Sequence, residues 1–127
     1  SDNDYAAQAS GAIEAFGNHD VVIVHVEAPD EAGHAGDIAA KIAAIEAIDR
    51  EVVGRLLASG IEMRLLAMPD HPTPIALRTH VGEAVPFVLW GPGIPSNGAD
   101  AYSESAAADT GLFLDPGRGV MDLLLAQ

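Results

Sequence analysis

The chain has 127 residues, enough for one domain with a hydrophobic core. Its net charge is −13, from 6 basic and 19 acidic residues, which argues against nucleic acid or an anionic membrane surface as a partner. The absence of cysteine excludes disulfides, thiolate metal ligands and cysteine nucleophiles. The sequence shows no membrane-span pattern and no signal-peptide pattern, so we expect a cytoplasmic protein.

The first predicted elements are a helix and a strand. Residues 4–16 carry apolar side chains at helical spacing, and Gly17 follows as a stop signal, which predicts a helix. Residues 20–27 form a continuous β-branched run, typical of a strand covered on both faces in a parallel sheet. We expect residues 28–36 to form a loop between this strand and the next helix.

A long amphipathic helix is predicted next. Asp37 is the expected N-cap and Gly60 the expected stop. Residues 61–68 then predict a second strand. A helix between two strands forms a βαβ unit, so the two strands should be parallel, with a right-handed crossover. One helix face carries the predicted core residues Ile38, Ile42, Ile45, Val52 and Leu56.

The second half of the chain begins with a long, proline-rich segment over residues 69–84. Loops of this length without a regular pattern are usually functional or disordered. Residues 85–90 predict a third strand, and residues 103–110 and 118–126 predict two short helices.

Aspartate and histidine residues follow two of the predicted strands. Asp30 and His34 come after the first strand, and Asp70 and His71 come after the second. The carboxyl ends of parallel strands meet at the same edge of a sheet, so these side chains should lie close together. His80 belongs to the same long loop as Asp70 and can also reach this edge.

This donor set suits a divalent metal ion. Imidazole and carboxylate ligands without thiolate favour Mn, Zn, Co or Fe over Ca or Mg. One metal typically takes three protein ligands, which Asp30, His34 and His80 could supply. Asp70 and His71 would then be only part of a second ligand set. No serine has a base or a glycine elbow beside it, so the sequence predicts an incomplete site without its own nucleophile.

Three further polar residues lie near these predicted ligands. Lys41 lies in the first turn of the long helix and could face a phosphate, although a solvated helix lysine fits its position better. Arg78 has the same two interpretations and is favoured for function because it precedes His80. Thr73 is flanked by two prolines, and the sequence gives little reason to assign it a functional hydroxyl.

A different class of protein also fits part of the pattern. A non-enzymatic, receiver-like α/β signalling module would place clustered acids after its first strand. Such a module has no set of histidines, so the three histidines at positions 34, 71 and 80 count against it.

Several motifs together resemble the cofactor-independent phosphoglycerate mutases. They are Asp-Glu-Ala-Gly-His over 30–34, Asp-His-Pro-Thr-Pro over 70–74, Thr-His at 79–80 and Val-Pro-Phe-Val over 85–88. The match is closer to the archaeal-type branch of this family, within the alkaline phosphatase superfamily, and covers nearly the whole chain. The resemblance implies an α/β fold with an alkaline-phosphatase-like, mostly parallel sheet flanked by helices, of which this chain would form part.

The resemblance also implies a two-metal enzyme whose substrate is a phosphorylated three-carbon acid. Such an enzyme interconverts 3-phosphoglycerate and 2-phosphoglycerate through a phosphoenzyme. Asp30, His34 and His80 would bind one metal, and Asp70 and His71 the other. Manganese is the usual metal, with Mg, Zn or Co as alternatives.

The family's nucleophile, a metal-binding aspartate near its N-terminus and its inserted substrate domain have no counterpart in this sequence. Residues 1–127 would therefore be the C-terminal part of the metal-binding catalytic domain and inactive alone. The missing N-terminal half would be a partner, and the surface left open could promote self-association. Related phosphatases, phosphodiesterases and sulfatases, and members labelled homoserine kinase or phosphonopyruvate decarboxylase, remain alternatives.

Overall fold

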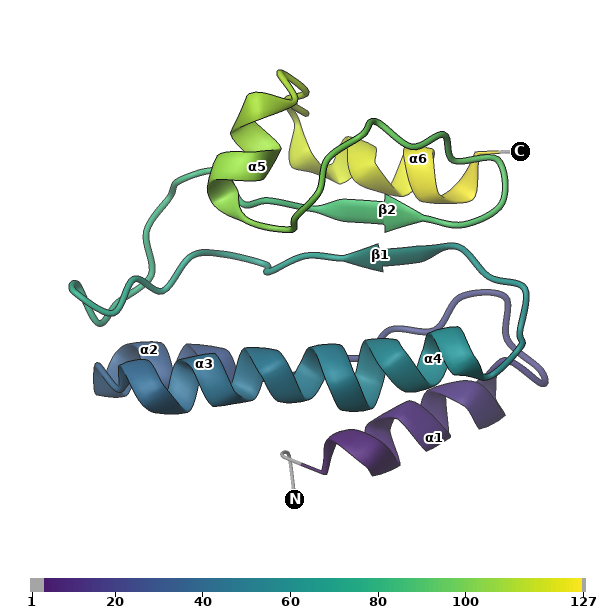
Figure 1. Cartoon of the computed structure of the whole chain (residues 1–127), viewed down its shortest axis with the longest axis horizontal. Helices are drawn as coiled ribbons and strands as arrows, with labels where there is room; N and C mark the ends of the chain where they lie inside the picture. Colours follow the sequence, from purple (N-terminus) through teal and green to yellow (C-terminus); the bar gives the residue numbers. More distant parts are fainter. Residues whose placement is uncertain (1–3, 127) are drawn as a thin grey trace. The chain divides into compact units, whose positions relative to one another are not determined.

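The computed structural model describes residues 4–126, which form two compact units. The first unit contains the chain up to Ile61 together with Thr73–Val81, and is helical. The second contains Glu62–Pro72 and the chain from Gly82, and holds the sheet (Figure 1). Among the described residues, no helix has the length and apolar character needed to span a bilayer.

The predicted N-terminal helix is confirmed as α1 (Tyr5–Ala15). The Asp4 side chain caps it by accepting a hydrogen bond of 3.0 Å from the Ala7 amide. Ala9 and Ala12 are its buried residues, so this helix contributes small side chains to the core of the first unit.

The segment expected to form a loop over residues 28–36 is instead the helix α2 (Ala28–Ala35). Pro29 lies in its first turn, where the missing N–H is not needed by the helix. Gly36 ends it in the left-handed conformation, with φ of 71°. The loop prediction was wrong because the two glycines, read as loosening the backbone, lie inside a short helix (Gly33) and at its C-cap (Gly36).

The long helix is confirmed as three continuous pieces: α3 (Ile38–Ala47), a π-helical turn η1 (Ile48–Val53) and α4 (Gly54–Ala58). Its N-cap is Asp37, as predicted, and accepts a hydrogen bond of 2.9 Å from the Ala40 amide. Gly60 follows its C-terminal end with φ of 75°, which agrees with the predicted stop.

The predicted apolar face of this helix is correct for two of its five residues. Val52 and Leu56 are buried, but the three isoleucines at 38, 42 and 45 are more than half exposed. The inward side of α3 instead runs through part-buried Lys41 and buried Ala44, and α3 contacts α2. The side of α3 that is covered therefore carries a lysine and an alanine, while the isoleucines face solvent.

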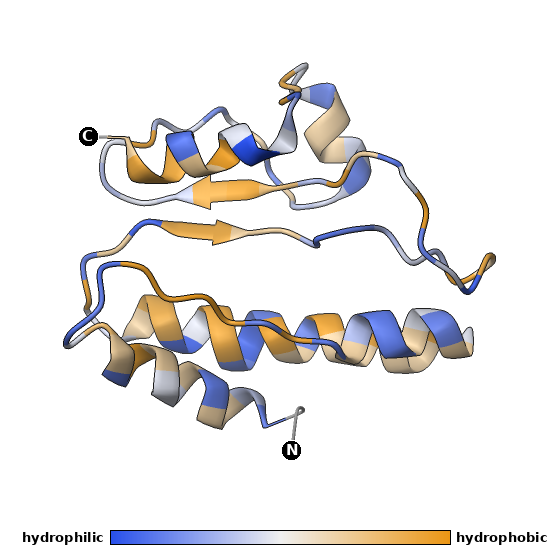
Figure 2. Cartoon of the chain, turned by 180° about the vertical axis from the view of Figure 1, so that it is seen from behind, coloured by the Kyte–Doolittle hydropathy of each residue, from blue (hydrophilic) through white to orange (hydrophobic). Residues whose placement is uncertain are grey.

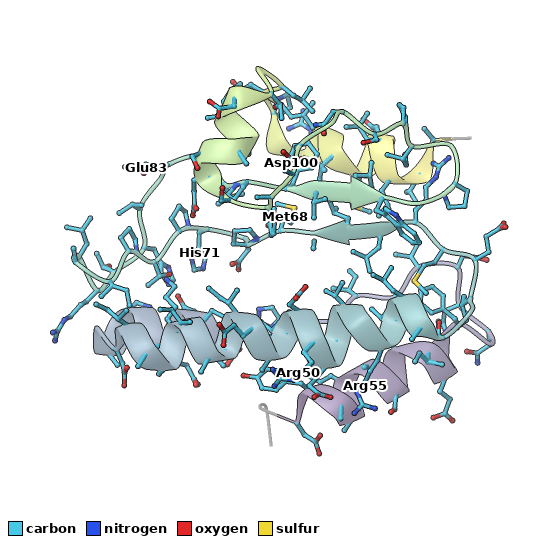
Figure 3. All side chains as sticks on the ribbon, viewed as in Figure 1. Arg50, Arg55, Met68, His71, Glu83 and Asp100 are labelled. Carbon is cyan, nitrogen blue, oxygen red and sulfur yellow. The ribbon has the colours of Figure 1, made fainter. Side chains whose placement is uncertain are left out.

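One side of the π-helical turn η1 and of α4 is charged. Arg50 and Arg55 both project from the same side of the helix (Figure 3) and lie 3.1 Å and 2.8 Å from carboxylate oxygens of Glu51. The side chains of Arg50 and Arg55 are exposed, so this stretch of the helix has a charged, solvated side.

The strand predicted over residues 20–27 is not present. Residues 21–27 run as an extended, apolar segment between α1 and α2 (orange in Figure 2), with alternating exposure and Ile23 85% exposed. Within residues 4–126, its backbone joins no ladder, and the His25 carbonyl accepts a hydrogen bond from the Gln8 side chain. A β-branched run becomes a strand only when a neighbouring strand pairs with it.

The second unit contains the two observed strands, β1 (Leu65–Ala67) and β2 (Val88–Trp90). They are shorter than predicted and pair antiparallel, with Leu66 opposite Leu89. The expected parallel pairing and βαβ crossover are therefore not found among the described residues. The long segment between the strands is irregular, as predicted, and the chain reverses direction through it.

Two short helices complete the second unit. The predicted helices are confirmed as α5 (Glu104–Asp109), capped by Ser103, and α6 (Val120–Leu125), which follows the 3-10 turn η2 (Gly117–Gly119). Arg64, just before β1, donates hydrogen bonds to the carbonyls of Pro92, Leu124 and Ala126. This guanidinium therefore links the sheet to the C-terminal end of α6, where a positive charge is favourable.

Candidate metal centre

Helix α2 places Asp30 and His34 on one face. The two residues are four positions apart, which makes their side chains neighbours on a helix. His34 Nε2 lies 3.4 Å from Asp30 Oδ2. The sequence spacing was therefore informative, but the element that carries it is a helix and not a strand-end loop.

His80 joins this pair from the segment 73–81 of the same unit. Its Nε2 atom lies 3.0 Å from His34 Nε2 and 3.2 Å from Asp30 Oδ1. All three side chains are between a third and a half exposed, so a solute can reach them. The structure thus brings together three of the five predicted metal ligands.

The orientation of His34 is set by a backbone carbonyl. Its Nδ1 atom donates a 2.9 Å hydrogen bond to the carbonyl oxygen of Arg78. In the neutral imidazole this leaves the lone pair on Nε2, the atom that faces Asp30 and His80. Metal-binding histidines commonly donate their second N–H in this way.

Arg78 adopts an unusual backbone conformation at this point, with φ of 53°. Positive φ is uncommon outside glycine, and such residues cluster at functional sites. Here the conformation directs the carbonyl of Arg78 to His34. The guanidinium of Arg78 lies against Gly36, where a Cβ atom would approach Nε to 2.5 Å.

The spacing of the donor atoms suits one metal ion. Two ligands of one ion, each bonded at roughly 2.1 Å, lie roughly 3.0–3.4 Å apart for bond angles between about 90° and 110°. The two imidazole Nε2 atoms lie 3.0 Å apart, His80 Nε2 lies 3.2 Å from Asp30 Oδ1, and His34 Nε2 lies 3.4 Å from Asp30 Oδ2. Two imidazole nitrogens and one carboxylate at these separations form a donor set that suits a transition metal or zinc.

Thr73 is the residue that the sequence interpretation undervalued. It is 5% exposed, and its hydroxyl donates a 2.5 Å hydrogen bond to Asp30 Oδ1. This bond is the main cause that lowers the pKa of the Asp30 carboxyl; partial desolvation opposes it, and His34 and His80 lower the pKa further. The two flanking prolines, which restrict the backbone at Thr73, were the available signal.

Asp70 and His71 form a pair within the second unit. They lie on the segment that follows β1, close after Met68 (Figure 3). The His71 amide donates a 3.0 Å hydrogen bond to Asp70 Oδ1, and His71 Nε2 lies 3.5 Å from Asp70 Oδ2. Both residues thus offer carboxylate and imidazole donors beside the end of a strand.

Lys41 has a structural contact that neither sequence interpretation anticipated. Its ammonium group donates a 2.7 Å hydrogen bond to the Thr73 carbonyl and is partly buried. In this position, Lys41 connects α3 to the segment that carries Thr73 and His80.

Comparison with known proteins places these features in a family. The profile described as the metalloenzyme superfamily matches residues 1–125. A 2,3-bisphosphoglycerate-independent phosphoglycerate mutase of Methanothrix thermoacetophila is 43% identical over 98% of this chain and 33% of its own length. The mutase 2 of Methanothermobacter thermautotrophicus is 45% identical over 98% of this chain and 31% of its own length.

A solved structure is also similar. The PH0037 protein from Pyrococcus horikoshii matches 96% of this chain and 37% of its own chain, with a TM-score of 0.90 and 27% identity. The chain therefore spans about a third of the length of the proteins it matches. The match to a metalloenzyme family argues against the alternative of a receiver-like signalling module.

Proposed function

Because the chain belongs to the metalloenzyme superfamily, we propose that it is the C-terminal, metal-binding part of a cofactor-independent phosphoglycerate mutase. The full-length protein would interconvert 3-phosphoglycerate and 2-phosphoglycerate in the cytoplasm through a phosphoenzyme. The observation that carries this proposal is the convergence of Asp30, His34 and His80 at 3.0 to 3.4 Å, in a chain similar to named mutases.

We assign these three residues to one divalent ion, with manganese as the first choice. Asp70 and His71 would supply part of the ligand set of a second ion. The nucleophile, the remaining ligands and the substrate-handling domain would come from the other two thirds of a full-length protein, given the length of the relatives.

The local charge at the cluster, and not the net charge of the chain, supports a phosphate ester as substrate. The chain carries a net charge of −13, which repels an anionic phosphoglycerate at long range. At the cluster, Asp30 contributes one negative charge, while His34 and His80 bind a metal as neutral imidazoles. A bound divalent ion would keep a net positive charge there, which stabilises a phosphoryl group and favours ionisation of a hydroxyl nucleophile.

Calorimetric titration with Mn²⁺ tests the ligand assignment. We expect the wild-type chain to bind Mn²⁺ weakly and His34→Ala to bind more than about tenfold more weakly still, because one of three ligands is lost. His19→Ala is the matched control, since the exposed His19 bonds the Ala15 carbonyl at the end of α1. Equal affinity of the wild type and His34→Ala would contradict the assignment.

A mutase assay on the isolated chain tests the second part of the proposal. We expect no turnover, because the attacking hydroxyl is assigned to residues outside this chain. Turnover by the chain alone would show that the nucleophile lies within residues 1–127.

A further inference from the structure

Among the described residues, Thr73 is the polar residue that is buried, with 5% of its surface exposed. A buried hydroxyl must be hydrogen-bonded, because its desolvation is otherwise costly. Its donor bond to Asp30 Oδ1 is 2.5 Å long, at the short end expected for a hydroxyl and an ionised carboxylate. Burial also removes this hydroxyl from contact with a substrate, so a role as nucleophile does not fit.

The bond to Thr73 constrains the rotation of the Asp30 carboxylate. With Oδ1 held by the hydroxyl, the two oxygens lie 3.2 Å from His80 Nε2 and 3.4 Å from His34 Nε2. Without this contact, the carboxylate could rotate about its terminal torsion angle, whose distribution is broad. The hydroxyl therefore selects the orientation in which Asp30 faces both imidazoles.

Thr73 is itself fixed from two sides. Lys41 donates a 2.7 Å hydrogen bond to its carbonyl oxygen. Gly33 of α2 lies so close that a Cβ atom there would be 2.7 Å from the same oxygen and 2.9 Å from Thr73 Cγ2. The hydroxyl thus belongs to a tightly packed group that includes residues of α2 and α3.

We propose that Thr73 is a positioning residue, whose hydroxyl holds the Asp30 carboxylate in register with His34 and His80 for one divalent cation. This role rests on the proposed metal-binding function of that cluster. It extends the set of functional residues to a side chain that does not touch the ion.

The variant Thr73→Val tests the role of the hydroxyl, because valine keeps the shape and removes the donor. We expect its Kd for Mn²⁺ to rise about 10- to 100-fold, the usual effect of losing a group that orients a metal ligand. Thr73→Ser keeps the hydroxyl and should retain most of the affinity, whereas a role in packing alone would be impaired by the lost methyl group.

Thr110→Val is the matched control, since the hydroxyl of Thr110 bonds the Ala107 carbonyl in the second unit. Unchanged Mn²⁺ affinity in a folded Thr73→Val chain, with His34→Ala impaired, would overturn the positioning role alone. Absence of Mn²⁺ binding by the wild type would overturn both this role and the proposed function. If Thr73→Val does not fold, Thr73→Ser decides: retained affinity supports the role, and lost affinity in a folded chain refutes it.

Discussion

Gly33→Ala tests the close contact between α2 and the segment that carries Thr73. In a helix, alanine is favoured over glycine by about 1 kcal/mol. At Gly33, however, the new Cβ would lie 2.7 Å from the Thr73 carbonyl oxygen and 2.9 Å from Thr73 Cγ2. Relieving such a clash in packed surroundings costs about 1–3 kcal/mol. The net expectation is a loss of roughly 0–2 kcal/mol in the free energy of unfolding.

Gly11→Ala is the matched control. Gly11 lies inside α1, and a Cβ there would meet no heavy atom within 4 Å. This variant should gain about 0.5–1 kcal/mol, because the helix preference acts without a clash. Urea unfolding of both variants measures the difference, and Mn²⁺ titration of Gly33→Ala measures whether a displaced Thr73 weakens the metal site. Equal stabilisation by the two substitutions would refute the packing argument.

Three further predictions concern single residues. Asp37→Ala should lower the free energy of unfolding by about 1 kcal/mol in urea titrations, because the cap of α3 is lost; an unchanged midpoint would contradict this. In Mn²⁺ calorimetry, Arg78→Gly should keep the affinity and Arg78→Val should lower it, because glycine adopts positive φ readily and a β-branched residue does not; equal affinities would exclude a role for this conformation. The pKa of Asp30 is lowered in the folded chain, so on acidification the unfolded chain binds this proton first. The ionised Asp30 therefore stabilises the fold above its ordinary pKa of 3.8, and this stabilisation is lost as the pH falls further below that value. The slope of unfolding midpoint against pH should be shallower below this value in Thr73→Val, and identical slopes would argue against the Thr73 hydroxyl as the main cause.

Local sequence patterns were sufficient for most of the helices. Asp37 and Ser103 cap their helices with their own side chains, and Gly60 ends one through its backbone conformation. Each of these effects acts within a few residues, so the sequence contains the necessary information. The loop prediction for α2 failed because a glycine can lie inside a short helix, as Gly33 does, or end one, as Gly36 does.

The sheet depended on information that is not local. The run over 21–26 has the β-branched composition of a strand, yet pairing occurs between Leu65–Ala67 and Val88–Trp90. Strand propensity indicates a side-chain surface that suits a sheet, but a partner is required before a ladder forms. The exposed isoleucines of α3 illustrate the same limit, since periodicity does not reveal which side of a helix another element covers.

The candidate site could be predicted in part. The spacing of Asp30 and His34 and the position of His80 identified three residues that the structure brings together. The roles of Thr73 and of the Arg78 carbonyl could not be inferred, because they depend on tertiary packing and on one unusual backbone angle. Whether Asp70 and His71 bind a second ion stays a prediction.

The extended segment over 21–26 also bears on how this chain behaves in solution. Six consecutive residues, Val-Val-Ile-Val-His-Val, combine high β-propensity with low charge, and Ile23 is 85% exposed. Such a stretch is a template for intermolecular β-pairing. The net charge of −13 opposes that association by mutual repulsion between chains. Acidification or high salt should therefore increase light scattering by this chain, and a lysine in place of Ile23 should suppress the increase.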